Sequence, residues 1–301
     1  MIKYILAAQA LKFFSLNTTT ENLYRRLGNL IGGNVRKTKI PSHYIERANN
    51  NLNRIEQYNG IKDGMKILEL GTGWVHWESL YISLFYDVEV IAFDVWDNRQ
   101  LLGFKTYASQ LLNELHNIKR PEKQLNRAKS LLKRLKDCDN FDDIYEILNI
   151  TYLIDETGSL KNVSDDSIDL IYSSDVLEHI PIKSVGSLFK DMHRVLKVNG
   201  LSAHWVVPFD HLTIYDSSLN GKNYLQYSEK KWKLLFENKV QYINRLQMSE
   251  WVELFNKHSF KLIHCFVEQR TDISELHVSN RFSHLSNDDL ECGVFSIIGQ
   301  K

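Results

Sequence analysis

Short apolar runs alternate along this chain with stretches in which apolar residues recur every three or four positions. Seven runs have the length and composition of buried β-strands: residues 66–70, 88–93, 150–154, 167–173, 201–207, 260–267 and 293–298. Helical periodicity stands between them, for example at 77–86, 183–196 and 249–258. Repeated strand–helix units predict an α/β fold, a doubly wound and mostly parallel sheet of seven strands with helices on both faces.

Some parts of the chain lie outside this alternation. Residues 1–60 have helical periodicity and predict an N-terminal helical cap, in which Gly28, Gly32 and Gly33 are expected to end a helix. The first helix of the cap is expected to pack on the main domain rather than to anchor in a membrane surface. Residues 61–301 then form the main domain, with insertions at about 97–149, which looks helical, and 208–247, which is rich in aromatic residues.

The most informative segment surrounds the end of the first predicted strand. Residues 65–74 read MKILELGTGW, so a buried strand that contains Glu69 breaks into a turn with Gly71 and Gly73. Glycine lacks a Cβ atom and lets backbone N–H groups approach a ligand closely. The second strand ends about twenty residues later in Asp94, where a carboxylate takes both hydroxyls of a ribose. The pair predicts a nucleoside-containing cofactor across the carboxyl ends of parallel strands.

In residues 69–73, in Asp94 and in Asp155 the chain resembles the class I S-adenosylmethionine-dependent methyltransferases, over roughly residues 61–301. The segments SIDLIYSSDVLEHI, which begins at Ser167, and LKVNGL, which begins at Leu196, follow in the order of that family. The resemblance implies the Rossmann-like methyltransferase fold, whose last strand enters the sheet antiparallel between the fifth and sixth strands. Val75 stands where the family's commonest turn has a third glycine, so a stiffer and wider loop is expected.

The resemblance also implies how this chain binds S-adenosyl-L-methionine, whose product is S-adenosyl-L-homocysteine. Asp94 would hold the ribose hydroxyls, Asp155 would reach the adenine amino group, and Ser174 would lie beside the methionine part. The other residues expected in the cofactor site belong to the first turn: Glu69, Gly71, Thr72, Gly73 and Trp74. No metal site is expected.

Methyl transfer depends mainly on positioning, because the sulfonium carbon is already electrophilic. A hydroxyl acceptor also benefits from a general base, and His211, just past the fifth strand, is the first candidate. His179, after the fourth strand, either takes this role or supports the cofactor loop. The motif of amine and amide methyltransferases, Asn-Pro-Pro-Tyr, is missing after the fourth strand, which favours oxygen as the acceptor atom. Similarity to bacterial methyltransferases of small molecules and glycans, in residues 208–211, 227–229 and 244–246, implies an acceptor of that kind.

Composition argues against other classes of protein. Lys plus Arg and Asp plus Glu both number 37, and zero net charge argues against a dedicated nucleic-acid-binding protein. The basic segment 119–136 is interpreted as the solvated face of a helix in preference to a site for a phosphorylated or nucleic-acid partner, which stays the alternative. No apolar run approaches the length of a membrane span. Cys138, Cys265 and Cys292 lie far apart without metal-ligand spacing and indicate a reducing compartment, so a cytoplasmic enzyme is expected.

Two other functions stay open at this point. A nicotinamide-dependent oxidoreductase would share the acidic residue after the second strand. Its fingerprint, however, needs glycine at the sixth position of the turn, where this chain has His76. A non-catalytic nucleoside-binding module of the same fold would retain the cofactor site without turnover.

Overall fold

The computed structural model describes residues 1–301. The strands are β1 (Lys66–Leu70), β2 (Glu89–Asp94), β3 (Ile150–Ile154), β4 (Ile168–Ser174), β5 (Leu196–Val206), β6 (Lys261–Arg270) and β7 (Cys292–Gln300). The α-helices are α1 (Ile2–Phe14), α2 (Thr18–Arg36), α3 (Ser42–Gln57), α4 (Trp77–Phe85), α5 (Leu101–Glu114), α6 (Glu122–Lys136), α7 (Phe141–Leu148), α8 (Ile182–Val195), α9 (Glu229–Leu235), α10 (Met248–Lys257) and α11 (Asn287–Leu290). Short 3-10 helices are η1 (Leu115–Asn117), η2 (Leu177–His179), η3 (His211–Tyr215) and η4 (Asn223–Gln226). None of the helices combines the length and the apolar character that crossing a bilayer requires.

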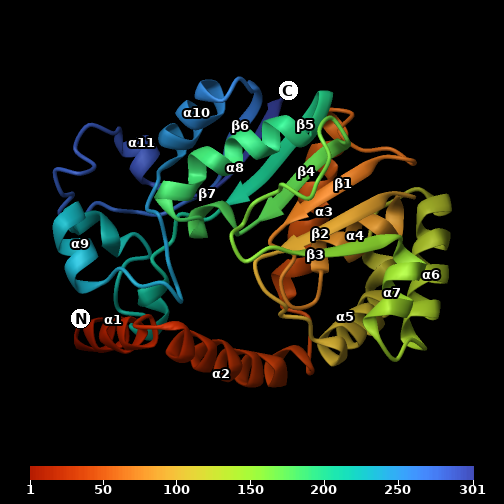
Figure 1. Ribbon diagram of the computed structural model, residues 1–301, viewed down its shortest axis with the longest axis horizontal. Coiled ribbons are helices and arrows are strands. Elements are labelled where there is room, and N and C mark those ends of the chain that lie inside the picture. The colour runs from red at the N-terminus through yellow and green to blue at the C-terminus, as the bar shows by residue number, and fades with distance from the viewer. The chain divides into compact units, whose positions relative to one another are not determined.

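The strands form one sheet in the order β3-β2-β1-β4-β5-β7-β6 (Figure 1). β1 pairs in parallel with β2 and β4, and β2 pairs in parallel with β3. The register places Leu70 beside Phe93 and Asp94 beside Ile154, so the carboxyl ends of β1, β2 and β3 share one edge. The strand order reverses between β1 and β4, which is where open α/β sheets bind their ligands.

The last strand, β7, lies between β5 and β6, as the resemblance implies. It runs antiparallel to β6, because the Thr271 N–H donates to the carbonyl of Glu291 while the His264 ring lies 2.8 Å from the Ser296 hydroxyl. Residue numbers therefore rise along β7 as they fall along the paired positions of β6, which is the antiparallel arrangement. The predicted α/β fold with a mostly parallel sheet of seven strands is confirmed.

The chain divides into two compact units. Unit 1 contains residues 1–28, 175–189 and 204–299, and unit 2 contains residues 29–174, 190–203 and 300–301. The residues expected to bind the cofactor lie in unit 2, whereas His179 and His211 lie in unit 1.

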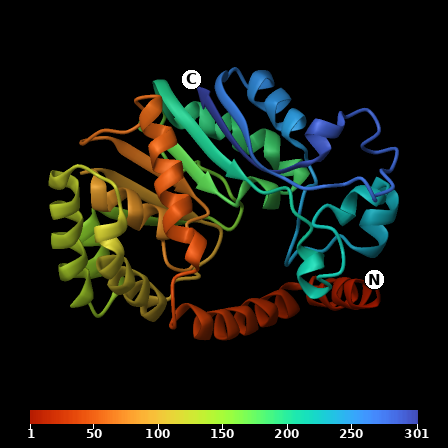
Figure 2. The ribbon, with the colours of Figure 1, turned by 180° about the vertical axis from the view of Figure 1, so that it is seen from behind.

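In unit 2, helices cover both faces of the sheet. α3 lies across one face, where the side-chain amide of Asn51 donates to the Tyr172 hydroxyl of β4 at 2.9 Å (Figure 2). The second half of α8 covers the other face, and its Met192 sulfur lies 3.9 Å from the Ser202 hydroxyl of β5. The stretch 97–149 holds α5, η1, α6 and α7, and α6 and α7 pack against α4.

Unit 1 has an aromatic core of its own, to which α1 contributes Tyr4, Ala8 and Leu11. Tyr4 lies 5.2 Å from Phe236 and 6.5 Å from Tyr227 between ring centroids. The first helix therefore packs on the folded chain, as expected.

One helix boundary is wrong in the sequence prediction. α2 continues to Arg36 through Gly28, Gly32 and Gly33, which the sequence suggests as its end. Glycine in a helix interior costs about 1 kcal/mol relative to alanine but removes no backbone hydrogen bond. A Cβ atom on Gly33 would lie 3.3 Å from the Gln100 side chain, so the missing side chain allows a close approach there.

Candidate functional site

The glycine turn after β1 is fixed against the end of β2. The N–H groups of Gly71 and Thr72 donate to the carbonyl oxygen of Phe93 at 2.9 and 3.1 Å. The N–H of Gly73 donates to Oδ2 of Asp94 at 2.9 Å. These bonds bring the turn and Asp94 together, as predicted. They also use the backbone N–H groups that the sequence predicted to face a ligand, so the turn offers a ligand the open space beside the Cα atom of Gly73 instead.

The Asp94 carboxylate is buried and held from both sides. Its Oδ1 accepts the N–H of Val95 at 2.7 Å, while Oδ2 accepts that of Gly73. Burial raises the pKa of Asp94, and the bonds from the backbone N–H groups oppose this rise. A carboxylate has roughly four acceptor positions, so Asp94 keeps capacity for hydroxyl groups of a ligand while its orientation is set by the protein.

The surface over the turn has room for a ligand. Gly73 has φ +66°, and a Cβ atom built on it would meet nothing nearer than the Gly71 carbonyl oxygen, 4.0 Å away. At the end of β4, the Ser174 hydroxyl is buried without a hydrogen-bond partner. An open cradle and an unpaired hydroxyl at the carboxyl ends of neighbouring strands fit S-adenosylmethionine, which has polar groups along its length.

A chain of buried hydrogen bonds runs from this turn to α7. The Tyr145 hydroxyl lies 2.9 Å from Nε2 of His76, and Nδ1 of His76 lies 2.7 Å from the Thr72 hydroxyl. Thr72 donates to Oε2 of Glu69 at 2.8 Å, and this oxygen also accepts the Ser79 hydroxyl. The chain ties the first turn of the site to the helical stretch after β2.

Burial sets the protonation states of the groups in this series of hydrogen bonds. It lowers the pKa of His76 to about 3, so the imidazole is neutral near pH 7. Because the one proton of Thr72 goes to Glu69, His76 donates from Nδ1 to Thr72 and accepts from Tyr145 at Nε2. Burial also raises the pKa of Glu69 to about 7, against the lowering effect of its bonds from Ser79 and Thr72. Glu69 is therefore poised between its two forms near neutral pH.

The indole of Trp74 is held by α2. Its Nε1 donates to the Asn29 side chain at 2.7 Å, and the Arg36 guanidinium lies 3.7 Å above the ring. The side chain remains 40% exposed. Trp74 is thus fixed in place and still offers a surface, and its contact with the cofactor stays a prediction.

Asp155 follows β3 and lies next to Asp94, to whose carbonyl oxygen its N–H donates at 3.1 Å. Its Oδ1 accepts the N–H of Thr157 at 2.9 Å, and the ammonium of Lys161 lies 3.4 Å from Oδ2. The hydrogen bonds from Thr157, helped by Lys161, hold the pKa of Asp155 below its usual value. In this structure the carboxylate caps a turn, and its bond to adenine stays a prediction.

In unit 1 the two candidate bases lie side by side. The ring centroids of His179 and His211 are 4.8 Å apart. Nδ1 of His179 is 2.7 Å from the Tyr242 carbonyl oxygen, and Nδ1 of His211 is 3.1 Å from that of Phe209. A carbonyl oxygen only accepts, so each Nδ1 carries the proton and each Nε2 keeps the lone pair of a neutral ring. Burial lowers the pKa of His179, and it lowers that of His211 to about 4.

Asn244, from one of the segments that carry the finer resemblance, fixes the loop of His179. Its side-chain amide donates to the carbonyl oxygens of Leu177 and Ile180, on either side of the histidine, at 2.8 and 3.1 Å. Its own N–H donates to the carbonyl of Glu178 at 2.8 Å. The segment therefore acts as a brace for the histidine loop.

Asp210 precedes His211 but does not orient its ring. The carboxylate is fully buried and accepts the Tyr4 hydroxyl at 2.7 Å and the Leu212 N–H at 3.1 Å. Burial raises the pKa of Asp210 to about 7, and the bond from Tyr4 opposes this rise. The role of Asp210 in this structure is to fasten the start of η3, which carries His211, to α1.

Sequence reasoning did not predict Tyr145 or Arg99 as neighbours of the turn. Arg99 forms two bonds with the Asp97 carboxylate, at 2.9 and 2.7 Å, and lies 4.8 Å above the Tyr152 ring. From the sequence, His76 served only as an argument against a dinucleotide-binding fingerprint. Its position directly after a glycine turn is the one signal that pointed to a residue supporting that turn.

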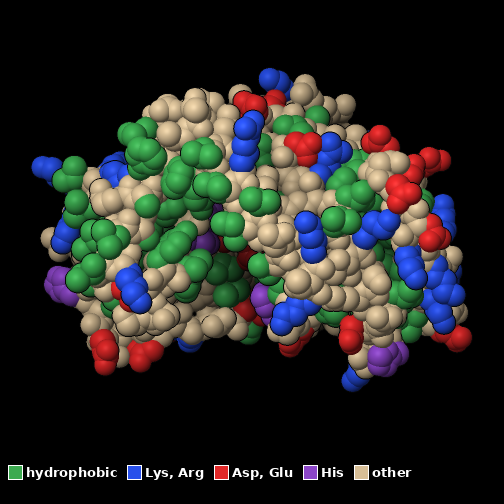
Figure 3. Space-filling view, turned by 90° about the horizontal axis from the view of Figure 1, so that it is seen from below, with side chains coloured by type: hydrophobic (Ala, Val, Ile, Leu, Met, Phe, Trp, Pro, Cys, Tyr) green, Lys and Arg blue, Asp and Glu red, His purple; other side chains and the backbone are tan.

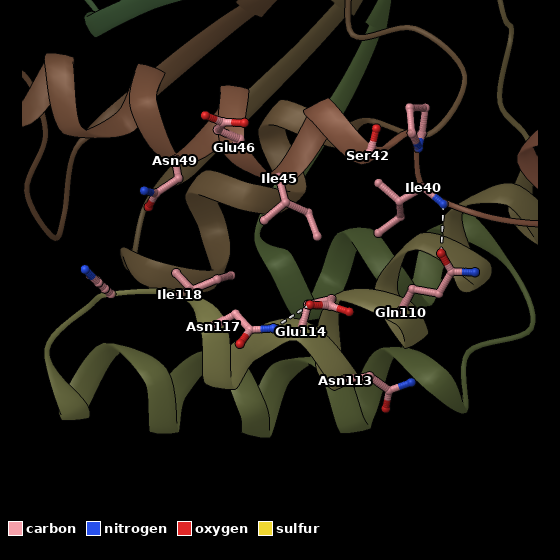
Figure 4. Close-up of a pocket in the computed structure, with 12 residues that line it drawn as sticks. Ile40, Ser42, Ile45, Glu46, Asn49, Gln110, Asn113, Glu114, Asn117 and Ile118 are labelled. Atoms are coloured by element: carbon pink, nitrogen blue, oxygen red, sulfur yellow. Dashed lines mark hydrogen bonds between the residues drawn. The ribbon is translucent and has the colours of Figure 1, made fainter.

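A cavity in unit 2 is a separate feature. It has a volume of about 650 Å³ and lies between α3 and the end of α5, with Ile45, Glu46, Asn113 and Glu114 in its wall (Figure 4). None of the residues predicted for the cofactor site lines it. The residues predicted for the cofactor site, at the turn and the strand ends, are therefore separate from this cavity.

Comparison with known proteins gives a match to a family model described as a methyltransferase domain, over residues 41–265. A methyltransferase structure from Methanosarcina mazei aligns over 82% of this chain and 96% of its own, with 17% identity and a TM-score of 0.47. Phosphoethanolamine N-methyltransferase 2 of Haemonchus contortus, solved with phosphomonomethylethanolamine and S-adenosylhomocysteine, aligns over 84% of this chain with 15% identity and a TM-score of 0.46. The chain spans 52% of the length of that protein. No curated protein sequence matches the chain.

Proposed function

Because this chain belongs to the class I S-adenosylmethionine-dependent methyltransferases, we propose that it methylates a hydroxyl group of a small molecule or of a sugar unit in a glycan. The observation that carries the proposal is the contact between the glycine turn and Asp94. The Gly73 N–H meets the Asp94 carboxylate at 2.9 Å, and the space over Gly73 is open. Both lie at the point where the strand order reverses.

The predicted residues would divide the cofactor among them. Asp94 would accept the ribose hydroxyls with the acceptor positions that the backbone leaves free, Asp155 would reach the adenine, and Ser174 would pair with the methionine part. The turn would line the rest through Glu69, Gly71, Thr72, Gly73 and Trp74. Bound S-adenosylmethionine supplies a methyl group on a positively charged sulfur, so the chain itself needs only to position the acceptor and to remove a proton.

His211 and His179 are proposed to remove that proton. Each is neutral near pH 7 and has the lone pair on Nε2, because Nδ1 donates to a carbonyl oxygen. A neutral imidazole suits a hydroxyl acceptor, whose proton must leave as the bond to carbon forms. The absence of an amine-type motif after β4 supports oxygen as the acceptor atom.

Binding and turnover test the proposal separately. Calorimetry with S-adenosylhomocysteine should show saturable binding to the intact chain, and NAD should show none. A panel of phenols, alcohols, sugars and amines incubated with methyl-labelled S-adenosylmethionine should give label on a hydroxyl compound. No binding of S-adenosylhomocysteine at millimolar concentration would remove the proposal. Binding without transfer to any acceptor would favour the non-catalytic module, and the comparisons give no support to the oxidoreductase.

Substitution of the histidines tests the proposed base. His211→Gln or His179→Gln should lower kcat about 10²–10⁴-fold and leave the affinity for S-adenosylhomocysteine unchanged. His277→Gln is the control, because His277 is an exposed histidine of the same unit. Full activity in both variants would show that neither ring takes the proton.

A further inference from the structure

α2 turns its apolar side away from the protein. Leu23, Leu27, Leu30, Ile31 and Val35 occur at positions i, i+4, i+7, i+8 and i+12, which places them on one stripe of the helix. Each of these side chains is between 41% and 66% exposed. A surface helix of a globular protein normally buries such a stripe against its core.

The contacts of α2 come from other positions on the helix. Asn29 accepts the indole N–H of Trp74 at 2.7 Å, and Arg36 donates to the Gln100 side chain at 3.0 Å. At 100° per residue, both point away from the apolar stripe. The helix is thus held by polar residues and presents its apolar ones to its surroundings.

α1, in unit 1, packs on its core through buried residues but also carries apolar residues on its outward side. Tyr4 and Leu11 are buried in unit 1, whereas Ile2, Leu6 and Phe13 lie on the opposite side of the helix and are 76%, 64% and 57% exposed. The view onto the side that carries α1 and α2 shows hydrophobic side chains gathered at the surface (Figure 3). We call the outward apolar side of the continuous helix α2 the apolar face.

Charge around the apolar face is one-sided. Residues 1–39 contain seven of the 37 Lys and Arg residues of the chain but only one of its 37 acidic residues, Glu21. That acid is already paired with Lys239 at 3.2 Å. Lys3, Arg26 and Lys37 are exposed. The excess positive charge of this segment stands out because the chain as a whole is neutral.

We propose that the apolar face docks on the surface of an anionic lipid bilayer. Helices with an exposed apolar stripe and basic polar sides lie in the membrane interface, where apolar side chains enter the headgroup boundary and Lys and Arg meet lipid phosphates. A second copy of the chain fits less well, because two such positively charged faces repel each other. The bilayer satisfies both the apolar stripe and the charge.

Vesicle binding by the full chain tests this proposal. In a pelleting assay, vesicles of phosphatidylcholine that contain about 30% phosphatidylglycerol should sediment at least tenfold more of the protein than vesicles of phosphatidylcholine alone. Added salt should weaken this binding, because it screens the charges. The double variant Leu27→Glu, Ile31→Glu should lose at least tenfold in binding. The control Val198→Glu changes an apolar residue that is more exposed, at 75%, and lies outside the apolar face, and it should bind as the parent does.

A charge variant keeps the test independent of the apolar substitutions. Arg26→Gln with Lys37→Gln should weaken binding to the anionic vesicles severalfold. Lys129→Gln with Lys133→Gln, on the exposed side of α6, should not. Equal binding to both kinds of vesicle, or full binding by both double variants at the apolar face, would overturn the proposal. So would a dimer in ultracentrifugation without vesicles that Leu27→Glu abolishes, because the apolar face would then bind a second copy.

Discussion

Replacing Asp94 by asparagine gives the sharpest test of the cofactor site. The substitution keeps the shape of the side chain and removes its charge. In the parent, Oδ2 accepts the N–H of Gly73 and Oδ1 accepts the N–H of Val95. An asparagine has one acceptor oxygen, so its NH₂ group must face one of these two donors. The variant therefore loses one of these backbone bonds as well as the charge that would strengthen the proposed bonds to a ribose.

The size of the effect follows from these bonds. Hydrogen bonds to a charged group are worth about 1.5–3 kcal/mol each, so the affinity for S-adenosylhomocysteine should fall about tenfold to hundredfold. The loss of one buried backbone partner should also lower the free energy of unfolding by about 1–3 kcal/mol. Because burial raises the pKa of Asp94, the parent should lose affinity as pH falls through that raised value, whereas the asparagine variant should not follow this change.

Calorimetric titration with S-adenosylhomocysteine measures the affinity, and urea unfolding measures the stability. Glu89→Gln is a matched control, since Glu89 is an acidic residue at the opposite end of the same strand. This control should bind the ligand with the affinity of the parent. If Asp94→Asn binds the ligand within twofold of the parent while remaining folded, the carboxylate does not hold the ribose.

Three further predictions concern the turn and the hydrogen bonds beneath it. Gly73→Ala and Gly64→Ala should each lower the free energy of unfolding by about 1–2 kcal/mol, because both glycines have positive φ. Only Gly73→Ala should also weaken the binding of S-adenosylhomocysteine. Equal affinity of the two variants in calorimetry would contradict this prediction. Glu69→Gln should remove a pH dependence of stability. The folded state keeps the Glu69 proton up to about pH 7, whereas the unfolded state keeps it only up to about pH 4.5. As pH rises through this window, the free energy of unfolding of the parent should therefore fall by about 1.4 kcal/mol per pH unit relative to the variant. Urea unfolding at several pH values measures the difference, and parallel curves would refute it. Tyr145→Phe leaves Nε2 of His76 buried without its donor and should cost about 1–3 kcal/mol in urea unfolding; unchanged stability would show that this bond contributes nothing.

The contact between the glycine turn and Asp94 could be predicted from the sequence because its signals are local. A glycine turn directly after an apolar strand, and an acid directly after the next one, need only the parallel pairing of neighbouring strands to meet. The register of β1 and β2 supplies that pairing, and Gly73 and Asp94 come into contact. The strand limits at 150–154 were predicted without error for the same reason, since the run of apolar residues is short and sharply bounded.

The contacts that hold the turn and the His179 loop in place could not be predicted from the sequence in this way. Tyr145 reaches His76 from 69 residues away, and no local pattern marks a tyrosine on an amphipathic helix as a partner of a distant imidazole. Asn244 braces the loop of His179 across a similar separation. Such contacts depend on which helix packs over which strand end, and the periodicity of a single segment does not contain that information.

The long α2 illustrates how a local rule fails when tertiary contacts decide. Three glycines argue for an early end of the helix, but its continuation lets Asn29 and Arg36 reach Trp74 in the glycine turn. The same helix carries the outward residues Leu30 and Ile31. If the apolar face rests on a bilayer, the helix that meets the lipid is also the one that holds the indole of Trp74 in the glycine turn. We therefore expect vesicle binding to change the fluorescence of Trp74, since a displacement of α2 alters the contacts that fix its ring.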